Sequence, residues 1–443
     1  MQLFKNVTAY LNINKTSVYN FYVNQFQNKE ANMKRKLLAL LLTTVSLSAG
    51  LASCNKKELT ETQKILEEAS KMTYAQLVEK AKEEVGDNTV QTYGNSSQLE
   101  KALEAFTEST GIKTQNTKKG DAETYVELGE AFQAKRYVAD MVLLQDGNKL
   151  QNEMLNFNYL DSFIPNDVKA NIAADDLEPT AAVYLNKVFM YNNTDYTGEN
   201  ADTAEAKKLS HYLTNVWQLA GSAADEGHIS NTSFKTPSNE NVNMNFLVML
   251  TSDEWVGKLT SAYKDFYKKD YEAEAKYKNI GYKWIAEFLQ NTQAHSSDGT
   301  ACKNVAKGVK GSMALVNLNK NKDLKESGVA KEDKANLTYP AMEEGDNLKG
   351  FGGFCYKMYA LVADNAKYPY AACAIVNYLL SAEGFGAAWG AKDGYYSVNK
   401  TAPIAATDKE LSWWKERLVI EDPEYVAKNY RDVFQFVQQY EGK

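Results

Sequence analysis

The 443-residue sequence is poor in the side chains that most often carry metal and acid–base chemistry. Its thiols and imidazoles belong to Cys54, Cys302, Cys355, Cys373, His211, His228 and His295. Their spacing matches no zinc site, and the histidines lie in polar stretches where we expect surface positions. No G-x-S-x-G, P-loop or H-E-x-x-H motif occurs. The sequence therefore predicts no catalytic site, no metal site and no cofactor.

Apolar runs long enough to cross a bilayer are also missing. The most apolar run, residues 37–50, has 14 residues, whereas a membrane-spanning helix needs about 20. Lys34, Arg35 and Lys36 precede this run, and the sequence LASC, ending at Cys54, follows it. A basic start, a short apolar run and a small-residue cleavage site are typical of a secretory signal peptide.

The LASC sequence resembles the lipobox of bacterial lipoproteins, in which the cysteine is lipidated and begins the mature chain. The resemblance implies a lipoprotein signal peptide at residues 33–53, a lipid on Cys54 and an extracytoplasmic location at the cell membrane. Residues 54–70 are polar, which predicts a flexible tether. Residues 1–32 have no place in a signal peptide, so we interpret them as a gene-model extension. An ordinary signal peptide with a chance cysteine is the alternative.

Positive charge is in deficit. The formal net charge is −7 at pH 7 for the whole chain, and residues 1–53 hold six basic residues and one acidic residue. The chain from residue 54 onward therefore has a net charge of −12, which argues against nucleic acid as a partner. Apart from Cys54, three cysteines remain, and they are compatible with either one disulfide or three buried thiols.

A strand–loop–helix–strand unit occupies residues 90–114. Residues 90–93 are rich in β-formers, and residues 94–96 (Gly-Asn-Ser) form a turn cluster. Ser97 and Glu100 have the S-x-x-E spacing of a helix capping box. Such units build parallel sheets, and ligands of open α/β sheets lie beyond the carboxyl ends of the strands. The loop after residue 93 is therefore the first candidate binding loop.

Strand and helix patterns alternate through the rest of the chain, which predicts an α/β fold. Further strands are predicted at residues 138–144, 181–191, 312–318 and 352–362. Helices are predicted at residues 122–134, 242–250, 253–267, 282–290, 301–307, 370–380, with 384–390 continuing the last of these, and 426–440.

Seven stretches between residues 72 and 403 resemble, in order, the motifs of bacterial extracellular solute-binding proteins of ABC importers. They are TYAQLVEKAKEE, VQTYGNSSQLEKALEAFTESTGIK, ADMVLLQDG, VFMYN, GVKGSMALVN, GDNLKGFGGFCYKMYALVADNAKYPYAACAIVNYLLSAEG and GYYSVNKTAP. The resemblance is to the type 2 group, which includes binders of iron(III), phosphonates and polyamines.

The resemblance implies two α/β lobes, each a mixed sheet flanked by helices, joined by two crossing strands. Lobe 1 would comprise residues 71–191 and 345–443, and lobe 2 residues 192–344. A monomer would capture a small polar solute between the lobes and deliver it to the permease of an ABC importer.

Ligand contacts are expected at strand ends, at a helix start and at the crossing between the lobes. The candidates are Gly94, Asn95, Ser96, Ser97, Gln145, Asp146, Tyr191, Asn192, Ser238, Asn239, Asn317 and Tyr395. A plain capped turn is the alternative at residues 94–97, and a simple turn is the alternative at Asp146. If Glu100 caps the helix amides, an anion is disfavoured there, and neutral or cationic solutes stay open alongside phosphonates.

Ferric iron is disfavoured on the same resemblance. Ferric-binding relatives carry adjacent tyrosines after the strand equivalent to residues 312–318, where this chain has Asn317, Leu318 and Asn319. Tyr395 and Tyr396 lie elsewhere and should point to opposite faces of an extended segment. Two other function classes remain as alternatives. One is a secreted lipid-anchored α/β enzyme, a hydrolase with catalytic carboxylates, and the other is a surface adhesion lipoprotein.

Overall fold

The computed structural model describes residues 58–196, 198–230, 232–307, 312–321, 337–343, 348–390 and 392–442. Residues 59–443 form one compact unit. The expectations for residues 1–32, for the signal peptide at 33–53 and for the lipid on Cys54 lie outside the described residues.

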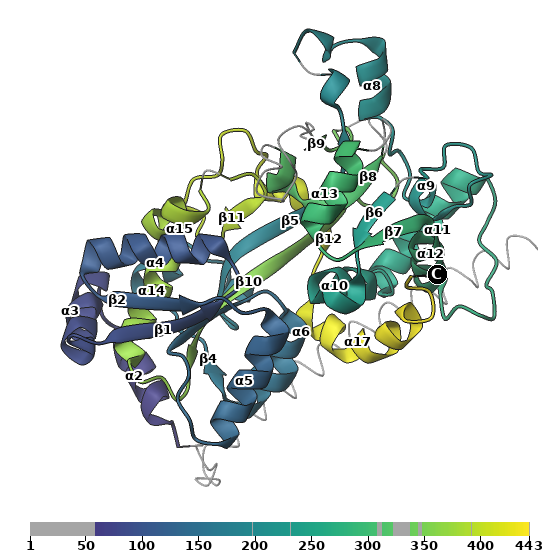
Figure 1. Cartoon of the computed structure of the whole chain (residues 1–443). Coiled ribbons are helices and arrows are strands. Elements are labelled where there is room, and N and C mark those ends of the chain that lie inside the picture. Colours follow the sequence, from purple (N-terminus) through teal and green to yellow (C-terminus); the bar gives the residue numbers. More distant parts are fainter. Residues whose placement is uncertain are drawn as a thin grey trace, which may run out of the picture. The chain divides into compact units, whose positions relative to one another are not determined.

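A mixed sheet forms the centre of this unit and has twelve strands over the described residues (Figure 1). Its main path runs in the order β2 (Lys113–Thr117), β1 (Thr89–Gly94), β3 (Met141–Leu144), β10 (Gly353–Ala363), β5 (Ala181–Asn192), β8 (Met313–Asn317), β6 (Thr232–Lys235), β7 (Thr292–His295). Four short strands complete it: β11 (Tyr395–Ser397) and β9 (Leu337–Thr338) on β5, and β12 (Val419–Ile420) and β4 (Leu160–Asp161) on β10.

The sheet has two halves of opposite strand direction. Strands β1, β2 and β3 are parallel to one another, and so are β6, β7 and β8. We call these sets the β1 half and the β6 half. Strand β10 is antiparallel to β3 and β5, and β5 is antiparallel to β8. Strands β5 and β10 therefore connect the two halves.

Both connecting strands have the continuous apolar sequence of a strand covered on both faces. In β5 every residue from Ala181 to Tyr191 is buried, and in β10 only Lys357 is partly exposed. The predicted α/β fold, with two strands shared between two halves, is confirmed.

Helices cover the β1 half of the sheet (Figure 1). They include α3 (Tyr74–Val85), α4 (Ser97–Thr110) and α14 (Pro369–Leu380), and α14 packs against both α3 and β10. Helix α5 (Asp121–Gln133) leads into β3. These bounds lie within a few residues of the patterns seen in the sequence.

The segment before α3 is helical, so the prediction of a flexible tether is wrong for its second part. Helix α2 (Glu61–Ala69) begins at a capping box formed by Thr60 and Gln63. It buries Leu66 and Ala69 and packs against α14. The high content of charged residues suggested a tether, although the T-x-x-Q spacing and the apolar spacing of Leu66 and Ala69 both indicate a helix.

Helices of the β6 half include α9 (Trp217–Ala220), α10 (Asn241–Met249), α11 (Asp253–Tyr267), α12 (Ile280–Asn291) and α13 (Asp298–Lys307). The C-terminal helix α17 (Pro423–Val437) packs against α10. Two fully buried tryptophans lie in this core, and each indole N–H donates to a backbone carbonyl, Trp217 to Leu259 at 3.0 Å and Trp284 to Val216 at 3.1 Å.

Shorter helices are α6 (Gly147–Lys149), α7 (Asn166–Lys169), α8 (Ala204–Ser210), α15 (Ala382–Ala388) and α16 (Leu411–Lys415). The expectation that α15 continues α14 is wrong. The extended backbone of Ser381 breaks the helix, and its hydroxyl accepts a hydrogen bond from the Gly384 N–H at 3.0 Å. Within the described residues no single helix is long and apolar enough to span a membrane; only α14 and α15 taken together, bent by 77°, reach that length and hydropathy.

The thiols of Cys302, Cys355 and Cys373 are all buried. Of the two arrangements compatible with the sequence, three buried thiols is the one that the structure has. Burial raises the pKa of the Cys355 thiol to about 12, so this thiol stays protonated and packs as a small apolar group.

Candidate functional site

The helix that follows the β1 loop begins at a different N-cap residue from the one predicted. Ser96 is the N-cap of α4, and its Oγ accepts from the Gln98 N–H at 3.2 Å. The predicted Ser97–Glu100 capping box is therefore wrong: the N-cap lies one residue earlier, at Ser96, and the residue three positions after it is Leu99 and not an acid. The objection to an anion that rested on Glu100 falls with it. Gly94 allows close packing, since a Cβ there would lie 2.5 Å from Leu99 Cδ2.

The turn after β3 is held by a carboxylate from the start of α5. Asp121 Oδ2 accepts from the backbone N–H groups of Gln145 at 2.7 Å and Asp146 at 2.8 Å. The Asp146 side chain is buried, caps α6 at Asn148 and accepts from Asn241 Nδ2 at 2.7 Å. Asp146 is thus the N-cap of a short helix and a partner of Asn241, and its contact with a ligand stays a prediction.

The loop after β6 leads through a short 3₁₀ turn, Pro237–Asn239, into α10. The backbone N–H and the hydroxyl of Thr236 both donate to the His295 carbonyl, at 2.8 and 3.0 Å. The Ser238 N–H donates to Glu441 Oε1 at 3.0 Å. These contacts fix the backbone of the loop, and the side chains of Ser238 and Asn239 are exposed.

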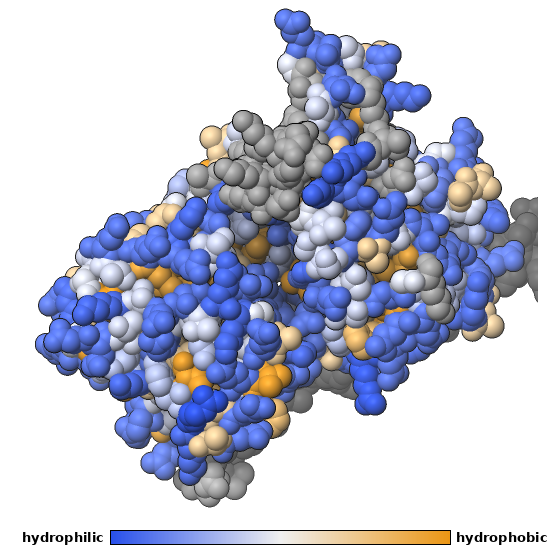
Figure 2. Space-filling model, in the orientation of Figure 1, coloured by the Kyte–Doolittle hydropathy of each residue, from blue (hydrophilic) through white to orange (hydrophobic). Residues whose placement is uncertain are grey.

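The three loops enclose a cavity of about 380 Å³ between the two halves of the sheet. In Figure 2 the surface is hollowed between these halves, with mostly hydrophilic residues around the hollow. The lining residues are Asn95, Gly120, Asp121, Ala122, Gln145, Lys235, Ser238, Asn239, Glu240, Asn241 and Val242. They lie at or after the carboxyl ends of β1, β2, β3 and β6, as the strand-end rule predicts.

Four of the residues singled out in the sequence meet at this cavity. Asn95 and Gln145 come from the β1 half, and Ser238 and Asn239 come from the β6 half. Their amide and hydroxyl groups can both donate and accept hydrogen bonds. The arrangement suits a small polar molecule and supplies hydrogen bonds from both sides.

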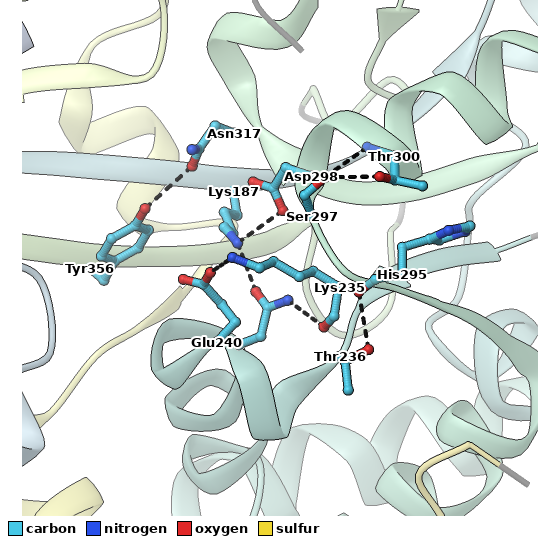
Figure 3. Close-up of polar contacts among 11 residues, drawn as sticks. Lys187, Lys235, Thr236, Glu240, His295, Ser297, Asp298, Thr300, Asn317 and Tyr356 are labelled. Carbon is cyan, nitrogen blue, oxygen red and sulfur yellow. Dashed lines mark hydrogen bonds and ion pairs between the residues drawn. The ribbon is translucent and has the colours of Figure 1, made fainter. Parts of the chain in front are cut away.

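Charged side chains gather beside the cavity in the β6 half (Figure 3). Lys187, on β5, is 2% exposed; its Nζ lies 3.3 Å from Asp298 Oδ1 and donates to Asn243 Oδ1 at 2.9 Å. Lys235 forms an ion pair with Glu240, and the Asn243 Nδ2 donates to the Lys235 carbonyl at 2.8 Å. Asn243 therefore ties the two lysine pairs together.

Two acidic groups of the lining have opposite pKa shifts. Burial and the nearby Asp146 raise the pKa of Asp121 to about 7, although the backbone donors of Gln145 and Asp146 oppose this. Burial also works against ionisation of Glu240, but Lys187 and Lys235 outweigh it and hold the pKa of Glu240 below its ordinary value.

A second group of buried acids lies behind the cavity. Asn245 Nδ2 donates to Glu421 Oε1 at 2.8 Å and lies 3.3 Å from Asp146 Oδ1. Burial raises the pKa of Glu421 to about 8. One amide therefore joins a carboxyl that follows β3 to one that follows β12.

The remaining predicted residues lie outside the cavity lining. Tyr191 is packed in the core, and Asn192 Nδ2 donates to the Val305 and Ala306 carbonyls at the end of α13. Gly94, Ser96 and Ser97 shape the β1 loop but do not line the cavity. Asn317 and Tyr395 lie on strands beside β5: Asn317 accepts from Tyr356 at 3.3 Å, and Tyr395 accepts from Asn319 at 3.4 Å.

The adjacent tyrosines do not form a pair of ligands. The Tyr396 hydroxyl donates to Asp408 Oδ2 at 2.6 Å, whereas Tyr395 is next to Asn319. Both side chains are buried, Tyr396 at 1% and Tyr395 at 9% exposure. Among the described residues, no three His, Cys, Asp or Glu side chains are placed to hold a metal ion.

Five residues at or beside the cavity were not singled out by any sequence pattern: Asp121, Lys187, Lys235, Glu240 and Asn241. One signal was present: Lys187 is the only charged residue in the apolar run 181–191, and a lysine inside a fully buried strand needs a partner. The partners themselves lie far away in the sequence.

No protein-family model and no curated protein sequence matches the chain. Solved structures share its fold. An iron- and citrate-bound protein from Trichodesmium (IdiA, FutA) is 17% identical, with 80% of this chain and 100% of that chain covered and a TM-score of 0.55. The ferric binding protein from Campylobacter jejuni is 14% identical, with 80% and 98% covered and a TM-score of 0.55.

A third structure, the periplasmic binding protein AfuA from Actinobacillus pleuropneumoniae with fructose-6-phosphate bound, is 17% identical, with 79% and 96% covered and a TM-score of 0.52. These likenesses, together with the shared strands β5 and β10, show that the chain has the fold of the type 2 periplasmic binding proteins.

Proposed function

We propose that this chain is an extracytoplasmic solute-binding protein that holds a small polar solute in the cavity between the β1 half and the β6 half. The observation that carries the proposal is the cavity itself. It lies at the carboxyl ends of strands from both halves and is lined by Asn95, Gln145, Ser238 and Asn239. Its volume of about 380 Å³ falls in the range of small-molecule sites.

The proposal includes two lobes, comprising residues 71–191 with 345–443 and residues 192–344. Binding would draw the lobes together about β5 and β10, because the solute would gain contacts from both walls only in the closed form. The closed monomer, tethered through a lipid on Cys54, would deliver its solute to the permease of an ABC importer. The similar structures from Trichodesmium and Actinobacillus pleuropneumoniae hold iron, citrate and fructose-6-phosphate, all of them small and polar.

An enzyme is the less favoured function. Ser233 Oγ and His295 Nε2 lie 3.1 Å apart, as a serine nucleophile and its base would. However, Ser233 is fully buried and its Oγ accepts from Asn304 Nδ2 at 2.8 Å. This serine is not presented to the cavity, so the contact supports the β6–β7 pairing and not a reaction.

Ferric iron is not the solute that we propose. After β8 the chain has Asn317, Leu318 and Asn319, and the Tyr396 hydroxyl is engaged by Asp408. Fe(III) needs a cluster of hard oxygen ligands, and within the described residues no acidic or histidine cluster takes their place.

The test is a thermal-shift screen of the purified protein against sugars, sugar phosphates, carboxylates, polyamines and Fe(III), followed by calorimetry on the solute found. Asn95→Ala should weaken its binding about tenfold, since one hydrogen-bonding side chain of the cavity is lost. Asn88→Ala is the matched control: Asn88 precedes the opposite end of β1, and its side chain donates to the Val85 carbonyl at 3.0 Å.

Two results would contradict the proposal. One is a melting temperature that no solute class raises. The other is a solute whose affinity is the same in the wild type and in Asn95→Ala.

A further inference from the structure

Four charged side chains of alternating sign lie beside the cavity: Asp298, Lys187, Glu240 and Lys235 (Figure 3). Asp298 pairs with Lys187, and Glu240 pairs with Lys235. Lys187 also acts electrostatically on Glu240. Glu240 is therefore a single carboxylate under the influence of two lysines.

Lys187 is costly for the fold. It comes from the middle of the central strand β5 and is 2% exposed, while its partner Asp298 is 16% exposed. Buried ion pairs are rarely better for stability than apolar residues of the same volume. A lysine kept at this position, beside a cavity, points to a role other than holding the sheet together.

Glu240 lies at the start of α10 as its N-cap residue, but its side chain makes no capping hydrogen bond. Glu240 and Lys235 both line the cavity, and their side chains are 20% and 21% exposed. The carboxylate is turned toward the two lysines, so its position is explained by their charge and not by the helix.

We propose that Lys187 and Lys235 form a subsite for an anionic group of the solute, and that Glu240 occupies this subsite as an internal counter-anion until the solute displaces it. The inference rests on the proposed function and names its substrate class: a small polar solute that carries a carboxylate or a phosphate. Displacement would move the Glu240 side chain toward solvent and expose Lys187 to the solute.

The arrangement has a consequence for specificity. An anionic solute must compete with Glu240, so binding is weaker than two lysines alone would give. A neutral solute leaves the Glu240 pair in place and gains nothing from Lys187. Competition with Glu240 thus lowers the affinity for every anion, and only an anion that contacts both lysines binds tightly enough to displace the carboxylate.

The closing experiment measures binding of citrate, inorganic phosphate, glucose and spermidine to the full chain and to Glu240→Gln by calorimetry. Loss of the competing charge should strengthen the binding of citrate, of phosphate or of both by about tenfold. A gain for citrate alone assigns a carboxylate, and a gain for both assigns a general anion subsite. Adding Lys235→Met should remove the gain.

Glu254→Gln is the matched control, because Glu254 pairs with Lys258 at 2.7 Å on the exposed face of α11; it should change no affinity. Glu240→Asp, whose carboxylate is one carbon shorter, should give a smaller gain and replaces Glu240→Gln if that variant does not fold.

The inference is overturned if neutralising Glu240 leaves citrate and phosphate binding unchanged or weaker, or if wild-type protein binds spermidine and Glu240→Gln loses it. In either case, a solute whose affinity still depends on Asn95 keeps the proposed function while the anion subsite fails. If Glu240→Gln binds anions at Lys235 but no solute in the wider screen binds the wild type, the function fails while the subsite stands.

Discussion

Asp121 and Glu240 are carboxyls on opposite walls of one cavity, and their surroundings push their pKa values in opposite directions. On the β1 wall, burial and Asp146 raise the pKa of Asp121 to about 7. On the β6 wall, Lys187 and Lys235 overcome burial and lower that of Glu240. At pH 7 the carboxyl on the β1 wall is about half protonated, whereas the carboxyl on the β6 wall is ionised.

The difference follows from what holds each wall. The β1 wall is fixed by backbone N–H groups that donate to Asp121, and such donors carry no net charge. The β6 wall is fixed by whole charges that pair with one another. One side of the cavity is thus held by uncharged donors, while the other carries the ion pairs that the proposed anionic solute would displace.

The largest effect on the free energy of unfolding is expected from Lys187→Met. Removing one partner leaves Asp298 with an uncompensated charge and Asn243 without its donor, so the free energy of unfolding should fall by about 3–5 kcal/mol. Adding Asp298→Asn should restore part of this loss, because the two sites are coupled. Urea denaturation measures both. A loss below about 1 kcal/mol would mean that the β6 wall is not held by its charges.

A smaller effect should come from Asp121→Asn, measured as unfolding free energy against pH. Folded Asp121 keeps its proton up to about pH 7, whereas its ordinary pKa is 3.8. Its contribution to stability is therefore full below pH 4 and is lost as the pH rises to 7. The stability of wild type minus that of Asp121→Asn should fall over this range by on the order of 1–3 kcal/mol and then level.

Glu240→Gln should give the opposite slope. Because the folded pKa of Glu240 is lowered from 4.5, its contribution is present above that value and is lost as the pH falls below it. The stability of wild type minus that of Glu240→Gln should therefore rise with pH in the acid range. If the stability difference between wild type and variant changed with pH in the same direction for Asp121→Asn and Glu240→Gln, the two carboxyls would not have opposite pKa shifts.

The smallest effect should come from an exposed pair of the same chemistry. Glu254 and Lys258 are 65% and 46% exposed on α11. Solvent screens such pairs, so Glu254→Gln should change the free energy of unfolding by less than about 0.5 kcal/mol. A loss as large as that of Lys187→Met would show that burial is not what distinguishes the β6 wall.

Local patterns were enough to predict most of the framework. Residues 253–267 form α11 as expected, and 181–191 became β5 with one residue more. Four candidate contacts also met at one cavity, because the strands of the two halves run in opposite directions and their carboxyl ends face each other across β5 and β10. The N-cap of α4 was misplaced by one residue, since serine is a favoured N-cap at both position 96 and position 97 and the S-x-x-E spacing pointed to Ser97.

The charged wall could not be predicted from sequence. Asp298 lies 111 residues from Lys187, and Asn245 lies 99 residues from Asp146 and 176 from Glu421. No local spacing encodes these distances, because they depend on how the two halves fold over β5 and β10. Asp121 likewise looked like an ordinary first-turn acid of a helix.

The pairing of β5 with β10 also bears on the order of folding. Residues Ala181 to Tyr191 are buried on both faces, yet the partner at Gly353–Ala363 is made much later in synthesis. Contacts so distant in sequence form slowly. Until they form, the edge of β5 that faces β10 is unpaired and can associate with other chains. A chain truncated before residue 353 should therefore not yield a stable first half, and should aggregate through the strand that was to join the two.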